Sequence, residues 1–223
     1  MTKDNFVDYI QGVLSVAIPT PELKKKFNSK DIVKCIARNM NIILGEKILI
    51  AKYSTGEYSF LDYYTKLFVN IPLQTDNATN QLCAEMPCII ADLPDNMAIR
   101  NIVPYITQCD KPYIDETQPF IYQTVGDASI FSHLDVDKTM RFKEYTMRFD
   151  KPFFKNVPSN ITAVAMNLVV SFESLNGKED VKDPFIKYDE HGNPQGDLVD
   201  RVLAEFSTKF KIEGSKSNVG DKA

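Results

Sequence analysis

Apolar residues recur at helical spacing near the start of the chain. The first run follows Asp4, which is suited to cap a helix, and it stops before Pro19. Thr20, Pro21 and Glu22 then resemble a cap, a first-position proline and a first-turn acid, which predicts a short helical piece. The apolar positions of the first predicted helix are Phe6, Val7, Ile10, Val13, Leu14 and Ala17.

A longer helix is predicted after Ser29, its expected cap. Gly45 stands where a left-handed C-terminal cap is wanted, so we expect the helix to end there. Both helices are amphipathic and must bury an apolar face, against the chain's own core or, less commonly, against a neighbour. Residues 1–45 therefore form a predicted N-terminal helical segment. The apolar positions of the longer helix are Ile32, Val33, Ile36, Ala37, Met40, Ile43 and Leu44.

From Lys47 onward the pattern changes to short runs of Val, Ile, Phe, Tyr and Thr between proline, glycine, Asn and Asp. Such runs are typical of strands and turns. In residues 65–71 the side chains of Leu67, Val69 and Ile71 are expected to share one face, with Lys66 and Asn70 on the other. Further strands are predicted at residues 82–86, 99–106, 120–125, 145–149 and 161–172, with turns at residues 93–96, 125–127 and 157–160.

The run at residues 161–172 is the strongest strand. Apolar side chains occupy both of its faces, which indicates a central strand. Strands at this spacing favour a small antiparallel sandwich or barrel over alternating strands and helices. The predicted fold class is α+β, in which residues 46–175 form an antiparallel β sandwich or barrel core between N-terminal helices and a C-terminal helix.

The last part of the sequence alternates between polar and amphipathic segments. Residues 176–197 are rich in charge, proline and glycine, which predicts a mobile connector. Asp197 is the expected cap of a final helix at 198–213, and Gly214 is expected to end it before a loose tail at 214–223. We predict that the apolar stripe of this helix contacts a neighbouring subunit. Its members are Leu198, Val202, Phe206 and Phe210.

Composition and charge argue against a protein that binds nucleic acid through its phosphates. The chain has 223 residues, 43% of them hydrophobic, and a net charge of −4. It can therefore bury a core, but it lacks the basic clusters that bind phosphate backbones.

No apolar run is long enough to span a bilayer, and no signal peptide is expected. Cys35, Cys83, Cys88 and Cys109 have no CxxC pair, so reduced thiols are expected; the gap between Cys83 and Cys88 lacks the second ligand pair that zinc would need.

Enzymatic motifs are missing from the sequence. There is no Walker-type or dinucleotide-binding glycine loop, no GxSxG and no HExxH. The paired carboxylates Asp115-Glu116, Asp135 with Asp137, and Asp189-Glu190 could in principle serve a hydrolase, but such pairs more often belong to solvated turns. His133 is similarly interpreted as a packing or capping residue. We predict a non-enzymatic protein with no cofactor and no metal.

Three segments carry a resemblance to a known family. Residues 64–73, 86–94 and 97–103, followed by Val157-Pro158 before a long strand and a charged segment before the final helix, resemble the neck or ring proteins of short-tailed, crAss-like phages of Bacteroidetes hosts. The resemblance covers most of residues 30–210. One departure is Ala98, which precedes Ile99-Arg100 where relatives often have glycine, and this puts the form of that turn in question.

The resemblance implies a virion structural protein of the head-to-tail connector. Such a subunit would belong to a homo-oligomeric ring, a dodecamer by family resemblance, that joins the portal to other neck and tail proteins. Double-stranded DNA would pass through the ring without sequence-specific binding, and the protein would be made in the host cytoplasm without membrane association. Two alternatives stay open: a carboxylate-based hydrolase of cell walls or glycans, and a monomeric β module that binds a ligand.

Overall fold

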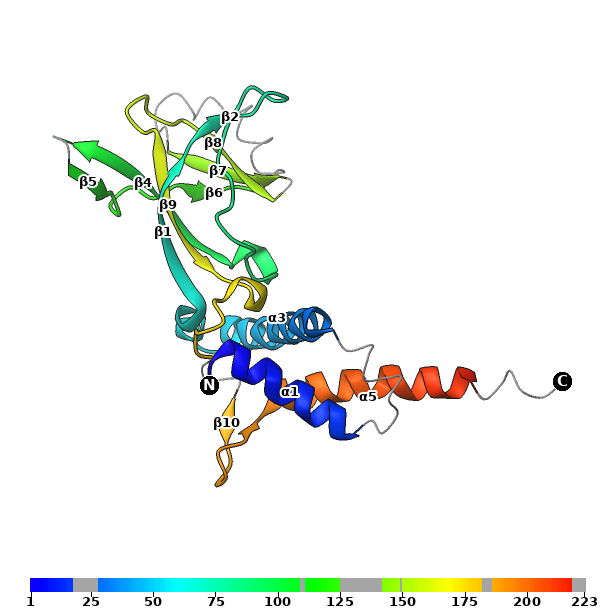
Figure 1. Cartoon of the computed structure of the whole chain (residues 1–223). Helices are drawn as coiled ribbons and strands as arrows, with labels where there is room; N and C mark the ends of the chain where they lie inside the picture. The colour runs from blue at the N-terminus through cyan, green and yellow to red at the C-terminus, as the bar shows by residue number, and fades with distance from the viewer. Residues whose placement is uncertain (18–27, 109–110, 125–141, 149, 182–185, 218–223) are drawn as a thin grey trace. The chain divides into compact units, whose positions relative to one another are not determined.

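The chain folds into two compact units. The computed structural model describes residues 1–17, 28–108, 111–124, 142–148, 150–181 and 186–217 (Figure 1). A helical unit consists of Met1–Tyr63, Ala91–Asp95 and the chain from Ser171 onward, and a β unit consists of Tyr64–Ile90 and Asn96–Val170. The α+β class is confirmed, and the strands form a sandwich-like or half-barrel core.

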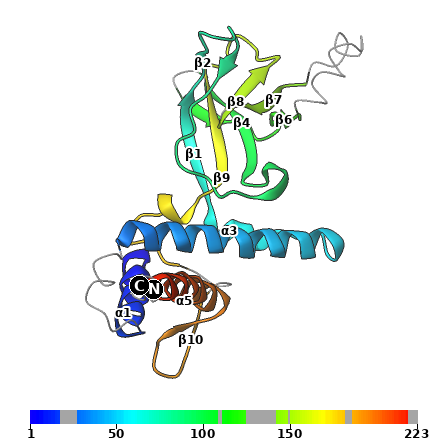
Figure 2. The ribbon, with the colours of Figure 1, turned by 90° about the vertical axis from the view of Figure 1, so that its right-hand side faces the viewer.

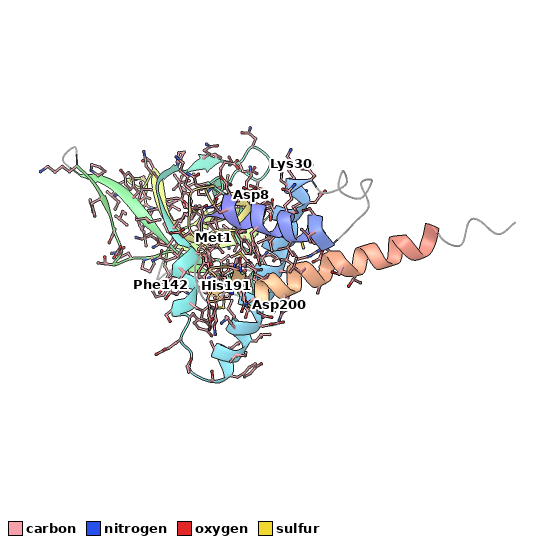
Figure 3. The ribbon with its side chains drawn as sticks, turned by 60° about the horizontal axis from the view of Figure 1, so that its bottom comes forward. Met1, Asp8, Lys30, Phe142, His191 and Asp200 are labelled. Atoms are coloured by element: carbon pink, nitrogen blue, oxygen red, sulfur yellow. The ribbon has the colours of Figure 1, made fainter. Side chains whose placement is uncertain are left out.

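In the described residues, three α-helices build the helical unit. α1 and α5 lie side by side, and α3 crosses them (Figures 1 and 2). Their buried faces carry Ile, Leu, Val and Phe, and their exposed faces carry many polar residues, including Asp8, Lys30 and Asp200, which are labelled in Figure 3. The bounds of the helical elements are α1 Lys3–Ala17, α3 Ser29–Tyr53, η1 Ser59–Tyr64, η2 Pro94–Asn96, η4 Phe172–Ser174 and α5 Asp197–Ser217.

The start of α1 is fixed by the segment that follows η4. The backbone N–H groups of Lys3 and Asp4 donate to the carbonyls of Glu179 and Gly177, at 2.8 and 3.1 Å. These bonds satisfy donors that the first turn of a helix cannot satisfy internally. Two parts of the chain that are distant in sequence are thereby joined in one unit.

Both ends of α3 and the C-terminal end of α5 differ from the prediction. α3 does not stop at Gly45 but continues to Tyr53, because the following residues are good helix formers and Ile48 and Ala51 extend the buried face. Its N-cap is Asn28, whose side chain accepts from the N–H of Lys30 at 3.1 Å, and not Ser29. α5 likewise runs past Gly214 to Ser217. A glycine lowers helix stability by only about 1 kcal/mol, which a buried face can outweigh.

The predicted connector contains a hairpin. Within residues 176–197, β10 (Lys187–Tyr188) pairs antiparallel with β11 (Pro194–Gln195), and the hairpin projects away from the helices (Figures 1 and 2). Val181, Ile186 and Pro194 are buried, so this segment also contributes to the helical unit's core. The predicted short helical piece at 20–22 lies outside the described residues.

Two sheets enclose the core of the β unit. One has the strand order β1-β9-β4-β5 and the other the order β2-β3-β8-β7-β6. Their shared core includes Ile102, Phe154 and Met166. The strands are β1 Thr65–Pro72, β2 Gln74–Thr75, β3 Leu82–Cys83, β4 Ile99–Gln108, β5 Lys111–Ile114, β6 Ile121–Tyr122, β7 Glu144–Arg148, β8 Lys151–Lys155 and β9 Ala163–Val169.

The predicted central strand is confirmed. β9 pairs with β1 on one side and β4 on the other, both antiparallel, and nearly all of its residues are buried. Its polar exception is Asn167, whose Nδ2 donates to Oδ1 of Asn101 on β4 at 2.7 Å. The antiparallel prediction fails at one place, because β6 pairs parallel with β7.

A β-bulge changes the faces of β1. Phe68 pairs with Met166 and Ile71 with Val164, so three steps along β1 match two along β9, and Asn70 adopts a φ of 55°. Leu67 and Val69 consequently lie on the exposed face, whereas Ile71 joins Phe68 against the core. The prediction that Leu67, Val69 and Ile71 share a face is therefore wrong.

Candidate functional site

The residues predicted to contact a neighbouring subunit lie on α5. Leu198, Val202 and Phe206 are buried in the core of the helical unit, where α5 packs on α3 and α1. Phe210 belongs to the same helix, but its side chain lies outside the described residues. The three described side chains hold the chain's own helices together, so in this structure they are not available to a neighbour.

A polar seam closes one side of the α3–α5 contact. Arg38 donates to the carboxylate of Glu205 on α5, and the buried Asn39 donates from Nδ2 to Oε2 of the same carboxylate at 3.0 Å. Asn39 also donates to the carbonyl of Cys35 at 2.9 Å. Because the buried amide is satisfied on both α3 and α5, it fixes the register of the two helices.

The second part of the seam centres on Arg201 of α5. Its two terminal nitrogens donate to the two carboxylate oxygens of Glu46 on α3, at 3.0 and 2.7 Å, and its Nε donates to Asp197 at 3.1 Å. The hydrogen bonds that Arg201 donates raise the pKa of its guanidinium, and the bond to Glu46 has a larger effect than the bond to Asp197. A bidentate arginine–carboxylate pair of this kind is more specific in geometry than a lysine pair.

Beside this seam, α3 presents apolar side chains to solvent. Ile42 is 44% exposed, Leu49 49%, Ile50 67% and Tyr53 85%. We call these four residues the α3 stripe. Among the described residues, no other helix or strand exposes as many large hydrophobic side chains, and contiguous exposed apolar residues mark interaction sites more often than scattered ones do.

Ion pairs border the α3 stripe. Lys52 donates to the carboxylate of Asp95 at 3.3 Å, and this hydrogen bond raises the pKa of the lysine. Toward α5, the border consists of the pairs Arg38–Glu205 and Glu46–Arg201. Each of these charges therefore already has a partner of opposite sign within the chain.

The β unit also exposes apolar side chains, but in smaller clusters. Leu67 and Val69 lie on the outer face of β1, and Ile121 and Phe142 are exposed elsewhere in the unit, the latter labelled in Figure 3. They come from separate strands and a loop. The α3 stripe is therefore the most continuous candidate surface in the described part of the chain.

The carboxylates considered for a hydrolase serve turns. Asp115 accepts from the backbone N–H and the hydroxyl of Thr117, at 3.1 and 2.6 Å. Asp189 accepts from the N–H groups of His191 and Asn193, at 2.9 and 2.7 Å, in the β10–β11 turn. These hydrogen bonds lower the pKa of Asp189, and those from Asn193 have the largest effect. Both carboxylates thus act as acceptors in local turns, which gives no reason to prefer a hydrolase.

The remaining candidates for chemistry are the cysteines and the residues considered as metal ligands or acid–base groups. Cys35 and Cys83 are buried cysteines outside any disulfide and Cys88 is a partly buried one, and burial raises the pKa of both Cys83 and Cys88. Within the described ranges, no three His, Cys, Asp or Glu side chains gather as a metal site requires. The other residues considered, His133, Asp135, Asp137 and Cys109, lie outside these ranges.

Comparison of the chain with protein-family models, with curated proteins and with solved structures found no match. In the part of the chain that the structure describes, no helix combines the length and apolar content needed to cross a membrane. The function must therefore be argued from the chain's own residues.

Sequence reasoning missed the α3 stripe because it ended the helix at Gly45. Ile50 and Tyr53 were then assigned to the β region. A signal was present: residues 46–52 combine strong helix formers with apolar positions that continue the buried face. Read as a helix, this segment has apolar residues on two faces, one of which stays exposed in the part of the chain that the structure describes.

Proposed function

We propose that this chain is a virion structural protein, a subunit of a ring in the phage head-to-tail connector. Many copies would close around the DNA channel and join the portal to other neck and tail proteins. Assembly would occur in the host cytoplasm. The protein would act through its surfaces, with no bond made or broken.

One observation carries the proposal: the α3 stripe, an apolar surface that the described residues leave exposed. Water-exposed Leu, Ile and Tyr side chains on one helix face favour association, since burying them removes apolar area from water. Assembly proteins need such a surface, whereas an enzyme needs convergent polar groups. The resemblance in residues 64–73, 86–94 and 97–103 to neck and ring proteins supplies the particular kind of assembly.

The charge of the chain is compatible with a DNA conduit. A net charge of −4 gives a polyanion little to adhere to, so DNA can slide through a ring of such subunits. This property is permissive, because many proteins with other functions have a similar charge.

Electron microscopy of the purified protein, together with light scattering, tests the proposal. We expect closed rings with a central hole and a mass that is an integral multiple of 25.3 kDa. A monomer at every soluble concentration that also hydrolyses peptidoglycan would overturn the proposal and favour the hydrolase alternative.

A further inference from the structure

Three of the four members of the α3 stripe point in similar directions. With about 100° per residue in an α-helix, Ile42, Leu49 and Tyr53 lie within about 40° of one another, and Ile50 lies about 60–100° further round the helix, at the edge of the stripe. At about 1.5 Å per residue the stripe is about 16 Å long. This is the pattern of apolar anchors by which one helix face docks against a partner.

The opposite face of α3 already has its partners. Ile36, Leu44 and Ile48 are buried in the helical unit, so the helix does not need the stripe to attach to its own unit. The stripe is an additional apolar surface on a helix whose core face is complete. An additional face of this kind is explained by a contact outside the unit.

The border of the stripe indicates what kind of partner fits. Arg38, Glu46 and Lys52 are each paired with an opposite charge of the chain, on Glu205, Arg201 and Asp95. These paired groups therefore leave little uncompensated charge for a DNA phosphate or a charged peptide. An apolar face with balanced charges is complementary to a similarly neutral apolar surface, and it avoids like-charge contacts between identical chains.

We infer that the α3 stripe is the surface on which the next copy of this chain docks. The inference rests on the proposed function and names one of its contacts. In a closed ring the contact is head-to-tail, so the stripe of one copy meets a different surface of the next copy. Leu49 and Ile50 lie between Ile42 and Tyr53 along the stripe, away from both of its ends, and should contribute most.

The test replaces these two residues with a charge-balanced pair. Leu49→Glu combined with Ile50→Lys leaves the net charge unchanged, and both new residues are good helix formers. The introduced lysine would follow Glu46 by four residues, a favourable spacing on a helix. We expect the double variant to raise the concentration needed for assembly at least about 100-fold, since central apolar residues dominate an interface, with unchanged circular dichroism and thermal unfolding.

The matched control lies on α1. Val16 is 84% exposed and belongs to the same unit but not to the stripe. Val16→Lys places an added charge on an exposed aliphatic position near a helix C-terminus, where a cation is tolerated. We expect this variant to assemble as the wild type does.

Analytical ultracentrifugation over a concentration series separates the outcomes. Rings in the wild type and in Val16→Lys, but a folded monomer in the double variant, support the inference. Rings in all three proteins overturn the inference while the proposed function stands. A wild type that remains monomeric at its highest soluble concentration overturns both, and equal loss of assembly in the two variants shows that the stripe has no special role.

Discussion

The two units of this molecule are held together in different ways. The helical unit joins α3 to α5, a helix much later in the sequence, and fixes their register with directional polar contacts, the Arg38–Glu205 and Arg201–Glu46 pairs and the Asn39 amide. The β unit depends on a core in which Phe120, Tyr145 and Phe154 pack with ring centroids 4.9 to 6.4 Å apart. Directional contacts specify where the helices sit, whereas the β unit is stabilised by an apolar core in which these aromatic rings pack among aliphatic side chains.

The largest expected effect concerns the aromatic core. Phe154→Ala should lower the unfolding free energy of the β unit by about 3–5 kcal/mol, because it removes a buried ring that touches two others. Hydrogen exchange read by mass spectrometry measures it separately for peptides of the β unit and of the helical unit. We expect the free energy of opening to shift more for the β-unit peptides than for the helical ones. Equal shifts would contradict the division into two units, and Phe154→Leu should cost much less.

The second prediction tests how α1 is fixed to the segment after η4. A Cβ added at Gly177 would overlap with the carboxylate of Asp4, so Gly177→Ala should cost about 1–2 kcal/mol as that side chain is displaced. Gly12→Ala is the control: nothing lies within 4 Å of its Cβ, and it should stabilise α1 by up to about 1 kcal/mol.

A double variant sharpens this result. Asp4→Ala removes the group that Gly177→Ala would meet, so the pair together should lose less stability than the sum of the single changes. Thermal unfolding of the four proteins gives the coupling. Strict additivity would show that Asp4 is not the cause.

The third prediction compares ion pairs of the two units. Glu46→Gln should cost about 0.5–1 kcal/mol, because it weakens a bidentate pair with Arg201 that is only partly exposed. Glu85→Gln weakens the more exposed pair with Lys151 and should cost less than Glu46→Gln does. Urea unfolding at low and high salt measures both. The reverse order would undermine the view that polar contacts matter more in the helical unit.

The smallest effect is the pH dependence of the β10–β11 hairpin. The pKa of Asp189 is lowered from 3.8 by its bonds from Asn193, so the folded pKa lies below the unfolded one. The carboxylate therefore contributes stability above pH 3.8 that is lost as the pH falls through the folded value. An NMR titration of Asp189 should give a midpoint below 3.8, and Asn193→Ala should move it part of the way back because the backbone bond remains. A midpoint at or above the ordinary value in the wild type would refute this.

Much of the fold could be predicted from local patterns, and the failures have identifiable causes. The stripes of α1 and α5 and the apolar run of β9 encode buried faces directly, so their types and central positions were correct. The bulge at Asn70 depends on pairing with β9, which comes much later in the sequence, and no local pattern reports it. Its one hint is that Asn adopts a positive φ more readily than most residues.

The candidate site could be predicted only in part. The stripe of α5 was correctly read as apolar, yet sequence alone cannot tell whether such a face meets the chain's own helices or a neighbour. Leu198 and Val202 turned out to meet their own helices. The α3 stripe was missed because Gly45 is a strong local signal for a helix end, and the burial of Ile48 and Ala51 that overrides it is a tertiary effect.

The late position of α5 in the chain has a consequence for the order of events during synthesis. α1 and α3 leave the ribosome early, but the side chains that cover their apolar faces, Leu198, Val202 and Phe206, emerge only after α5 has been made. Every strand of the β unit has been made by then. A nascent chain must therefore carry the sides of α1 and α3 that α5 later covers exposed to water while its sheets form, and chaperone binding to residues 32–51 would be the expected safeguard during that interval.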